Sequence, residues 1–135
     1  MKKIYLFIIL IILVIVSVIL YFVLNNNKTN NFTLIIKQSS WSGWSEDYVP
    51  EEITKEYKVE LNKEYVIDSY FIFTIKKINS NSIVIKTNNP LSDNQDGTIN
   101  LSSNKTKFTV TLDKELKLDT PSMDAGDIYY LTLKK

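Results

Sequence analysis

The chain has neither cysteine nor histidine among its 135 residues, and all of its 16 basic side chains are lysines. The absence of cysteine excludes a disulfide framework, a thiol nucleophile and a lipid-modified cysteine. The absence of histidine excludes imidazole acid–base pairs and imidazole metal sites. We therefore do not expect an enzyme, and the sequence predicts no catalytic residue, no metal ligand and no bound cofactor.

Glycine-rich phosphate loops are also missing, since the chain has only three glycines, and no Ser-x-x-Lys motif occurs. Neither sign of charge is in excess, because 16 lysines accompany 15 acidic residues. A balanced charge produces no global field that would recruit nucleic acid or an anionic membrane. The heavy use of Ile, Lys and Asn is typical of proteins encoded by AT-rich bacterial genomes.

The long hydrophobic run of this sequence covers residues 4–24 without interruption. As a helix of about 21 residues it would measure about 31 Å, which matches the hydrocarbon core of a bilayer. Its polar atoms are few: the Ser17 hydroxyl can bond to the preceding turn, and Tyr5 and Tyr21 lie near the two ends, where tyrosine favours the membrane interface. The sequence predicts an uncleaved transmembrane signal-anchor helix over residues 4–24.

A cleaved signal peptide is the competing interpretation, because Lys2 and Lys3 form a basic segment ahead of the run. The run is longer than the usual apolar region of a signal peptide, and no pair of small residues marks a cleavage site at its end. Two lysines precede the run and only Lys28 follows closely. The excess of positive charge on the N-terminal side places residues 1–3 in the cytoplasm and the C-terminal domain outside the cell membrane.

Residues 25–31 form a polar spacer, and beyond it the hydrophobic period changes from that of a helix to two. Apolar and β-branched segments separated by turn clusters indicate strands throughout residues 32–135. The expected strands are 32–38, 53–61, 65–68, 70–78, 83–87, 98–102, 107–112, 115–119 and 127–133, with the longest loop at 88–97. This pattern predicts an all-β domain, a small antiparallel sandwich of immunoglobulin-like or jelly-roll-like type with about seven to nine strands.

A distinctive short motif, WSGWS, covers residues 41–45 directly after the first expected strand. Its spacing resembles the W-S-x-W-S box of class I cytokine receptors and the tryptophan-rich strand of thrombospondin type 1 repeats. The receptor box stacks its indoles with arginines and the thrombospondin context requires cysteines, and this chain has neither. We interpret Trp41, Trp44 and Tyr48 as a candidate aromatic binding surface in an acidic loop. The alternative is that these side chains fold over the end of the core.

Residues 92–103 resemble a calcium-binding EF-hand loop, with Ser92, Asn94 and Asp96 at its first, third and fifth positions. Both anchoring carboxylates of that loop are replaced, the first by Ser92 and the last by Ser103. Strands instead of helices are expected on both sides. An ordinary Asp-Gly turn is therefore favoured over a calcium-stabilised adhesion domain.

Together these features predict a single-pass membrane protein that displays a β-domain for non-catalytic binding or assembly at the cell surface. The spacer reaches only about 15 Å as a flexible coil. The expected partners are therefore the membrane itself, neighbouring membrane proteins or cell-wall polymers, and not nucleic acid. An alternative from another functional class is an accessory or inhibitory subunit that contacts a membrane complex through its transmembrane helix.

Overall fold

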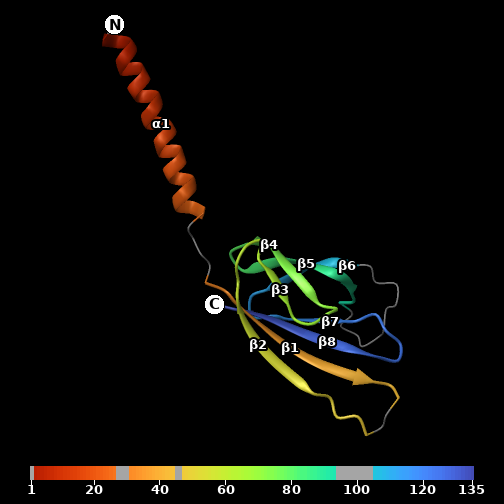
Figure 1. The fold of residues 1–135 in the computed structure, drawn as a ribbon. Coiled ribbons are helices and arrows are strands. Elements are labelled where there is room, and N and C mark those ends of the chain that lie inside the picture. The colour runs from red at the N-terminus through yellow and green to blue at the C-terminus, as the bar shows by residue number, and fades with distance from the viewer. Residues whose placement is uncertain (1, 27–30, 45–46, 94–104) are drawn as a thin grey trace. The chain divides into compact units, whose positions relative to one another are not determined.

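A computed structural model describes residues 2–26, 31–44, 47–93 and 105–135 of the chain (Figure 1). The chain divides into two compact units, Met1–Asn30 and Asn31–Lys135. The hydrophobic core is built entirely from residues of the second unit. The boundary between the units falls within the polar spacer that the sequence predicts.

The first unit consists of the helix α1 (Lys2–Asn26). Its side chains are described at Ile4, Tyr5 and residues 7–21, and all of these are exposed. The Ser17 hydroxyl donates a hydrogen bond to the carbonyl oxygen of Val14 at 2.8 Å, as expected for serine within a helix. Within the described residues, no helix is both long and apolar enough to cross a membrane. The transmembrane interpretation of residues 4–24 stays a prediction.

The second unit is an all-β sandwich of two four-stranded antiparallel sheets, as the sequence predicts (Figure 1). The first sheet has the strand order β2-β1-β8-β7, and the second has the order β3-β4-β5-β6. The strand bounds are β1 (Thr33–Ser42), β2 (Glu52–Lys58), β3 (Glu64–Val66), β4 (Ile72–Ile78), β5 (Ser82–Leu91), β6 (Lys105–Thr111), β7 (Glu115–Asp119) and β8 (Ala125–Lys134).

The order of these strands shows how the chain runs through the two sheets. The immunoglobulin-like or jelly-roll-like type of the sandwich stays a prediction. Here the described strands of the second sheet form a meander, and the chain changes sheets after β2 and after β6. The first and last strands of the domain, β1 and β8, pair along their whole length at the centre of the first sheet.

Two expected strands continue four residues past their expected ends, and one expected strand lies outside the described residues. The first was expected to end at residue 38, but β1 continues to Ser42 because Ser39–Ser42 pair with Ala125–Ile128 of β8. Strand β5 continues to Leu91, through residues where the sequence predicts the start of a loop. The strand expected at 98–102 falls outside the described part of the chain.

The core lies between the two sheets and consists mainly of alternate residues of their strands. Residues of β1 alternate so that Leu34 and Ile36 face inward and are buried, while Ile35 and Lys37 face outward. Strand β2 is the edge of its sheet, and its Ile53 is 43% exposed. The largest fully buried side chains are Tyr129, Phe32, Phe71, Phe73, Leu34, Ile36, Ile75, Ile83, Ile85, Leu91, Leu118 and Leu131.

One carboxylate joins the two sheets at the loop between β3 and β4. Asp68 Oδ2 accepts hydrogen bonds from the Tyr129 hydroxyl at 2.6 Å and from Gln38 Nε2 at 3.0 Å. Its other oxygen, Oδ1, accepts from the backbone N–H groups of Tyr70 and Phe71, both at 2.7 Å. The carboxylate thus has four donors, which offset the cost of removing it from water. It holds the β3–β4 loop against β1 and β8 of the opposite sheet.

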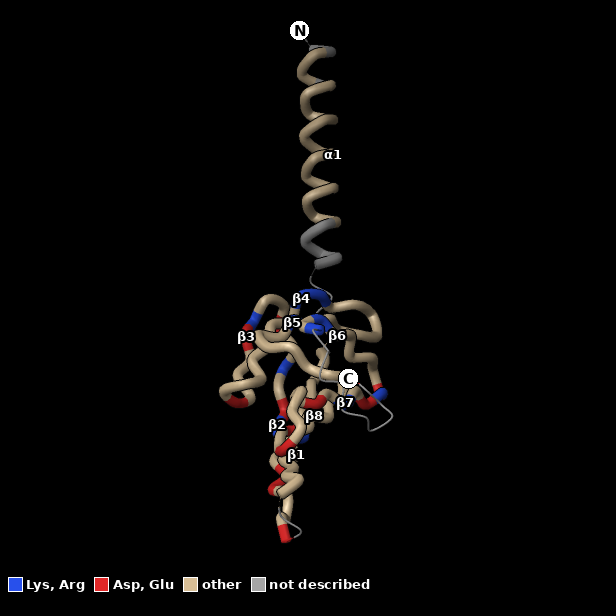
Figure 2. Tube along the Cα trace, turned by 90° about the vertical axis from the view of Figure 1, so that its right-hand side faces the viewer, with Lys and Arg blue, Asp and Glu red and all other residues tan. Residues whose placement is uncertain are grey.

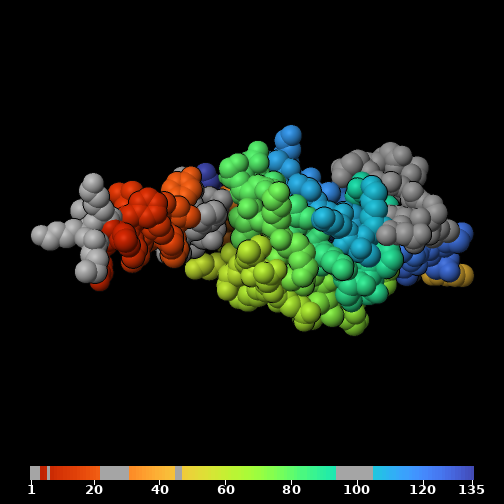
Figure 3. Space-filling model, turned by 90° about the horizontal axis from the view of Figure 1, so that it is seen from above, coloured from red at the N-terminus to blue at the C-terminus, as the bar shows by residue number. Residues whose placement is uncertain are grey.

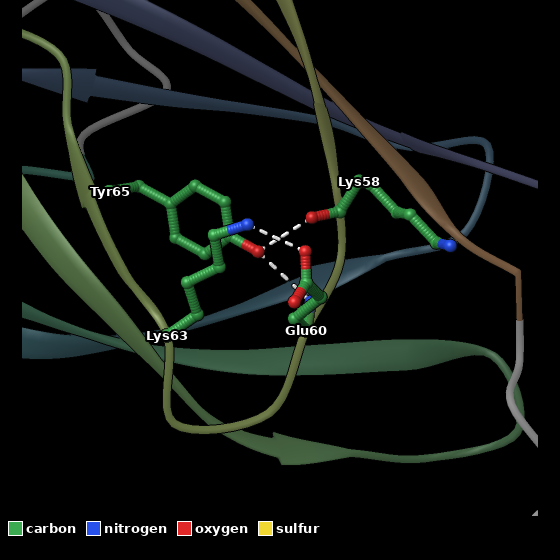
Figure 4. Close-up of polar contacts among 4 residues, drawn as sticks. All are labelled: Lys58, Glu60, Lys63 and Tyr65. Atoms are coloured by element: carbon green, nitrogen blue, oxygen red, sulfur yellow. Dashed lines mark hydrogen bonds and ion pairs between the residues drawn. The ribbon is translucent and has the colours of Figure 1, made fainter.

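Tyr65 connects the sheets at their other side, where β2 and β3 form neighbouring edges (Figure 4). Its hydroxyl donates to the Lys58 carbonyl oxygen at 2.6 Å and accepts from the Glu60 N–H at 2.9 Å. Burial raises the pKa of Tyr65. Lys63 Nζ lies 2.6 Å from Glu60 Oε1, but both groups are exposed, and such pairs contribute little to stability. The tyrosine therefore provides the main connection at this side.

Candidate binding surface at the β1–β2 connection

The structure places Trp41 in a strand and not in a loop. Trp41 is the second-last residue of β1 and pairs with Gly126 of β8. Since Leu34 and Ile36 point into the core, the strand's alternation directs Trp41 to the outer face of the β2-β1-β8-β7 sheet. The indole is half-buried there and does not belong to the core. The alternative in which Trp41 covers the end of the core is wrong for this residue.

Gly126 is what allows the Trp41 indole to lie close to the sheet. A Cβ built on Gly126 would lie 2.2 Å from Thr120 Oγ1 and 3.1 Å from Trp41 Nε1. Both distances are shorter than ordinary contacts, so no larger residue fits without displacing one of these side chains. Thr120 is itself fixed, because its Oγ1 accepts a hydrogen bond from the Asp127 N–H at 3.0 Å. The missing side chain at Gly126 therefore makes room for the indole.

The connection from β1 to β2, residues 43–51, is called the tip loop here; Ser45 and Glu46 lie outside its described part. The Gly43 N–H donates to the Asp124 carbonyl oxygen at 2.8 Å, which fastens the start of the loop to the β7–β8 connection. The Tyr48 hydroxyl is hydrogen-bonded to Ser40 Oγ on β1. Between these two attachments, the side chain of Trp44 is 79% exposed. Trp44 therefore does not cover the core either.

The three predicted site residues lie near one another along the chain but do not form one flat surface. Trp41 lies on the outer face of its sheet, whereas the neighbouring Ser40, which holds Tyr48, points to the opposite face. Tyr48 is 41% exposed, and Trp44 lies beyond the end of β1. The structure thus separates Trp41 from Tyr48 and leaves Trp44 as the most accessible aromatic side chain of the three.

Acidic side chains surround this region, as expected from the sequence. Asp47, Glu51 and Glu52 are exposed, and Figure 2 shows acidic positions gathered toward this end of the β1–β2 ribbon. Glu52 forms an ion pair with Lys37 at 2.9 Å, and this hydrogen bond raises the pKa of Lys37. The carboxylates of Asp47 and Glu51 have no such lysine partner in the described residues. They can accept hydrogen bonds from a bound molecule.

Further apolar residues extend the surface beyond those found from the sequence. Val49, in the tip loop, is 84% exposed. Ile128 and Tyr130 of β8 are half-buried on the same outer face as Trp41, since they pair with Ser39 and Lys37 of β1. The hydropathy of Val49 was visible in the sequence, but the position of Ile128 and Tyr130 beside Trp41 depends on the pairing of β1 with β8.

The calcium interpretation of residues 92–103 falls largely on residues 94–104, which lie outside the described part of the chain. Within the described residues, no group of three or more acidic side chains could hold a metal ion. Ser92 itself bridges Asp119 by two backbone hydrogen bonds, of 2.9 and 2.8 Å. It continues β5 onto the edge of the other sheet.

The fold and this surface define a two-sheet β-sandwich that carries an exposed aromatic loop at one end. Comparisons of the chain with family models, curated proteins and solved structures find no match. The chemistry of the chain's own residues is therefore the basis for its proposed function.

Proposed function

We propose that this protein is a single-pass membrane protein whose extracytoplasmic β-sandwich binds a surface partner through its tip loop, without catalysis. The apolar run of residues 4–24 supports the membrane anchor, because its length matches a bilayer core. The observation that supports the binding role is the exposure of Trp44 in a loop whose two ends are attached to β1 and to the β7–β8 connection.

A large aromatic side chain in water forgoes the free energy of burial, and exposed tryptophans on fixed loops are enriched among the residues that dominate binding. Trp44 and Val49 present apolar surface, while Asp47 and Glu51 beside them accept hydrogen bonds. An apolar ring face next to hydrogen-bond acceptors suits the alternating apolar and hydroxyl surfaces of a sugar. We therefore favour a cell-wall polysaccharide as the partner, with a neighbouring membrane protein as the second class.

Binding is tested by cosedimentation of the detergent-solubilised full chain with purified insoluble cell-wall polysaccharide. The substitution Trp44→Ala should weaken binding about tenfold or more, as expected for a binding hot spot. It should leave the melting temperature nearly unchanged, because the indole is exposed. The matched control is Leu61→Ala, which removes a side chain that is 55% exposed in the β2–β3 turn. Equal binding by both variants would contradict the role of the tip loop.

A protein partner is tested in the same region by placing a photo-crosslinking amino acid at Val49, with Leu61 again as the control position. Crosslinks from Val49 to one membrane protein, without wall binding, would identify a neighbouring membrane protein as the partner instead of a polysaccharide. If the chain showed no wall binding and no crosslink specific to Val49, the proposed binding role would be contradicted.

The membrane placement needs a separate measurement, and the absence of native cysteine makes it simple. A single cysteine introduced as Ser122→Cys should react with a membrane-impermeant maleimide in intact cells. A cysteine inserted after Met1 should react only after lysis. The reverse pattern would show that the orientation is wrong, and release of the chain by high salt or carbonate would show that α1 is not a membrane anchor.

A further inference from the structure

The outer face of the β3-β4-β5-β6 sheet carries lysines that form no ion pair within the described residues. Lys76 and Lys77 of β4, Lys86 of β5 and Lys107 of β6 are all exposed. We call these four residues the lysine face. Figure 3 looks onto this side of the sandwich, with β4, β5 and β6 in green to cyan, and Figure 2 shows lysine positions at β4 and close to the β5 and β6 labels.

The register of the strands brings these charges together. Lys86 lies directly opposite Lys107 across the β5–β6 pairing, and like charges in this position destabilise a sheet. Lys77 pairs with Val84 after an irregularity between Ile75 and Lys77. A bulge of this kind adds a residue to one strand, and here it leaves the consecutive residues Lys76 and Lys77 both exposed. The sheet thus concentrates positive charge on a face where neutral side chains would cost less.

Three lysines of the other sheet, one on each of β1, β7 and β8, lie beside carboxylates. Lys37 lies 2.9 Å from Glu52, and Lys117 lies 3.3 Å from Asp119. Lys134 lies 2.7 Å from Asp113. On the β3–β6 side, Lys105 is paired with Asp93 at 3.0 Å. In the described residues none of the four members of the lysine face has a carboxylate within ion-pair distance. Lys55 and Lys58 of β2 also have no ion-pair partner in the described residues, so the lysine face is distinguished by the position of its four unpaired lysines on the outer side of three adjacent strands.

A shallow hollow of about 250 Å³ lies within this face, lined in part by Lys76, Lys86, Thr74 and Asn88. Two ammonium groups beside a hydroxyl and an amide form a set of hydrogen-bond donors that suits a phosphate oxygen. One acid, Glu64, also lines the hollow and reduces its positive charge. The hollow is shallow, and the lysines are spread over three strands instead of following a line. This arrangement fits a broad anionic surface better than a single polymer strand.

We propose that the lysine face binds the headgroups of an anionic lipid bilayer and lays the sandwich against the membrane that anchors it. The proposal rests on the membrane anchor proposed above. A spacer with a reach of about 15 Å holds the domain at a high effective concentration near the lipid surface. Each lysine near an anionic surface then favours association by roughly fivefold, so four weak contacts are sufficient. With this face on the membrane, the tip loop of the opposite sheet stays free to bind its partner.

The test uses the full chain in lipid nanodiscs, with a donor dye on one introduced cysteine and an acceptor dye on the lipid headgroups. Thr109→Cys places the dye on the outer side of β6, opposite Val84, and Thr54→Cys places it on the outer side of β2, opposite Lys37. In discs with about one third phosphatidylglycerol, energy transfer should be stronger from position 109 than from position 54. The difference should disappear in phosphatidylcholine discs and at about 0.5 M salt, where the Debye length falls to about 4 Å.

The decisive variant replaces all four lysines, K76Q/K77Q/K86Q/K107Q, and should abolish the preference for position 109. The matched control K55Q/K58Q/K114Q/K135Q removes the same number of exposed lysines, none of which forms an ion pair in the described residues, and should retain the preference. An equal loss in both variants would show that only net charge matters and would overturn the proposal. Equal transfer from both positions in anionic discs would overturn it as well.

Two further outcomes distinguish this proposal from the proposed membrane anchor and from binding of a phosphate polymer. Failure of the wild-type chain to enter nanodiscs would count against the anchor, whereas normal incorporation without any effect of lipid charge would count against the lysine face alone. Labelled polyphosphate that binds the chain in neutral discs through the four lysines, while anionic lipid has no effect, would identify a phosphate polymer as the partner and overturn the bilayer proposal.

Discussion

The hydrogen bond between Tyr129 and Asp68 allows a quantitative prediction, because it joins residues 61 positions apart in opposite layers of the sandwich. Tyr129 is fully buried, and its hydroxyl lies 2.6 Å from Asp68 Oδ2. Replacing it with phenylalanine keeps the ring, which packs 4.5 Å from the Phe71 ring centroid, and removes only the hydroxyl. Asp68 Oδ2 would then keep Gln38 Nε2 as its remaining donor.

A hydrogen bond to a charged group contributes about 1.5–3 kcal/mol, so Tyr129→Phe should lower the free energy of unfolding by about 2 kcal/mol. For a domain of about 100 residues this corresponds to a fall of roughly 8 °C in the melting temperature. Urea unfolding followed by circular dichroism measures the free energy of unfolding, and thermal unfolding followed by the same signal measures the melting temperature. The control is Tyr130→Phe, the next residue on β8, whose side chain is half-buried on the outer face. A loss below about 0.5 kcal/mol for Tyr129→Phe, or an equal loss for both variants, would refute the reasoning.

Three further predictions concern pH, close packing and a buried hydroxyl. Burial, and then the hydrogen bond to Asp68, raise the pKa of Tyr129 well above its ordinary value. The contribution of this hydroxyl to stability is therefore complete below about pH 10 and is lost as the pH rises above that value. In urea titrations between pH 9 and 11, wild type should lose more stability than Tyr129→Phe, by up to about 1.4 kcal/mol per pH unit. Gly126→Ala should lower the free energy of unfolding by about 1–3 kcal/mol and shift the tryptophan emission, because the new methyl group collides with Thr120 Oγ1. Unchanged emission and stability would contradict the contact of Gly126 with Trp41. Ser92→Ala should leave stability unchanged or raise it by up to about 1 kcal/mol, because the buried Ser92 hydroxyl has no hydrogen-bond partner in the described residues. A clear loss of stability in thermal unfolding would show that a partner exists.

Local sequence patterns were sufficient to predict where most of the described strands lie. The alternation in residues 115–119 corresponds to β7, and the turn residues at 79–81 correspond to the connection between β4 and β5. The end of β1 could not be predicted in the same way. Residues 39–42 are polar apart from Trp41 and show no clear alternation, and they are extended because β8 supplies backbone partners. A strand that forms because a neighbouring strand pairs with it has only a weak strand pattern in its own sequence.

The candidate site was only partly predictable for the same reason. The sequence identified Trp41, Trp44 and Tyr48 by residue type, since large aromatics in a polar segment are unusual. It did not show that Trp41 and Tyr48 lie toward opposite faces, because that separation requires β1 to continue through Ser40 and Trp41. Nor did it show that Gly126 makes room for the Trp41 indole, since the two residues are 85 positions apart along the chain.

The sequence by itself determined the class of the fold and the exclusion of cysteine and histidine chemistry, because composition and periodicity are local properties. It also showed a nearly balanced total charge. Only the tertiary structure decided where that charge lies, because strand register places Lys86 opposite Lys107 while Lys37 meets Glu52. Register depends on contacts between residues distant in sequence, and the lysine face and the Asp68 connection both result from such contacts.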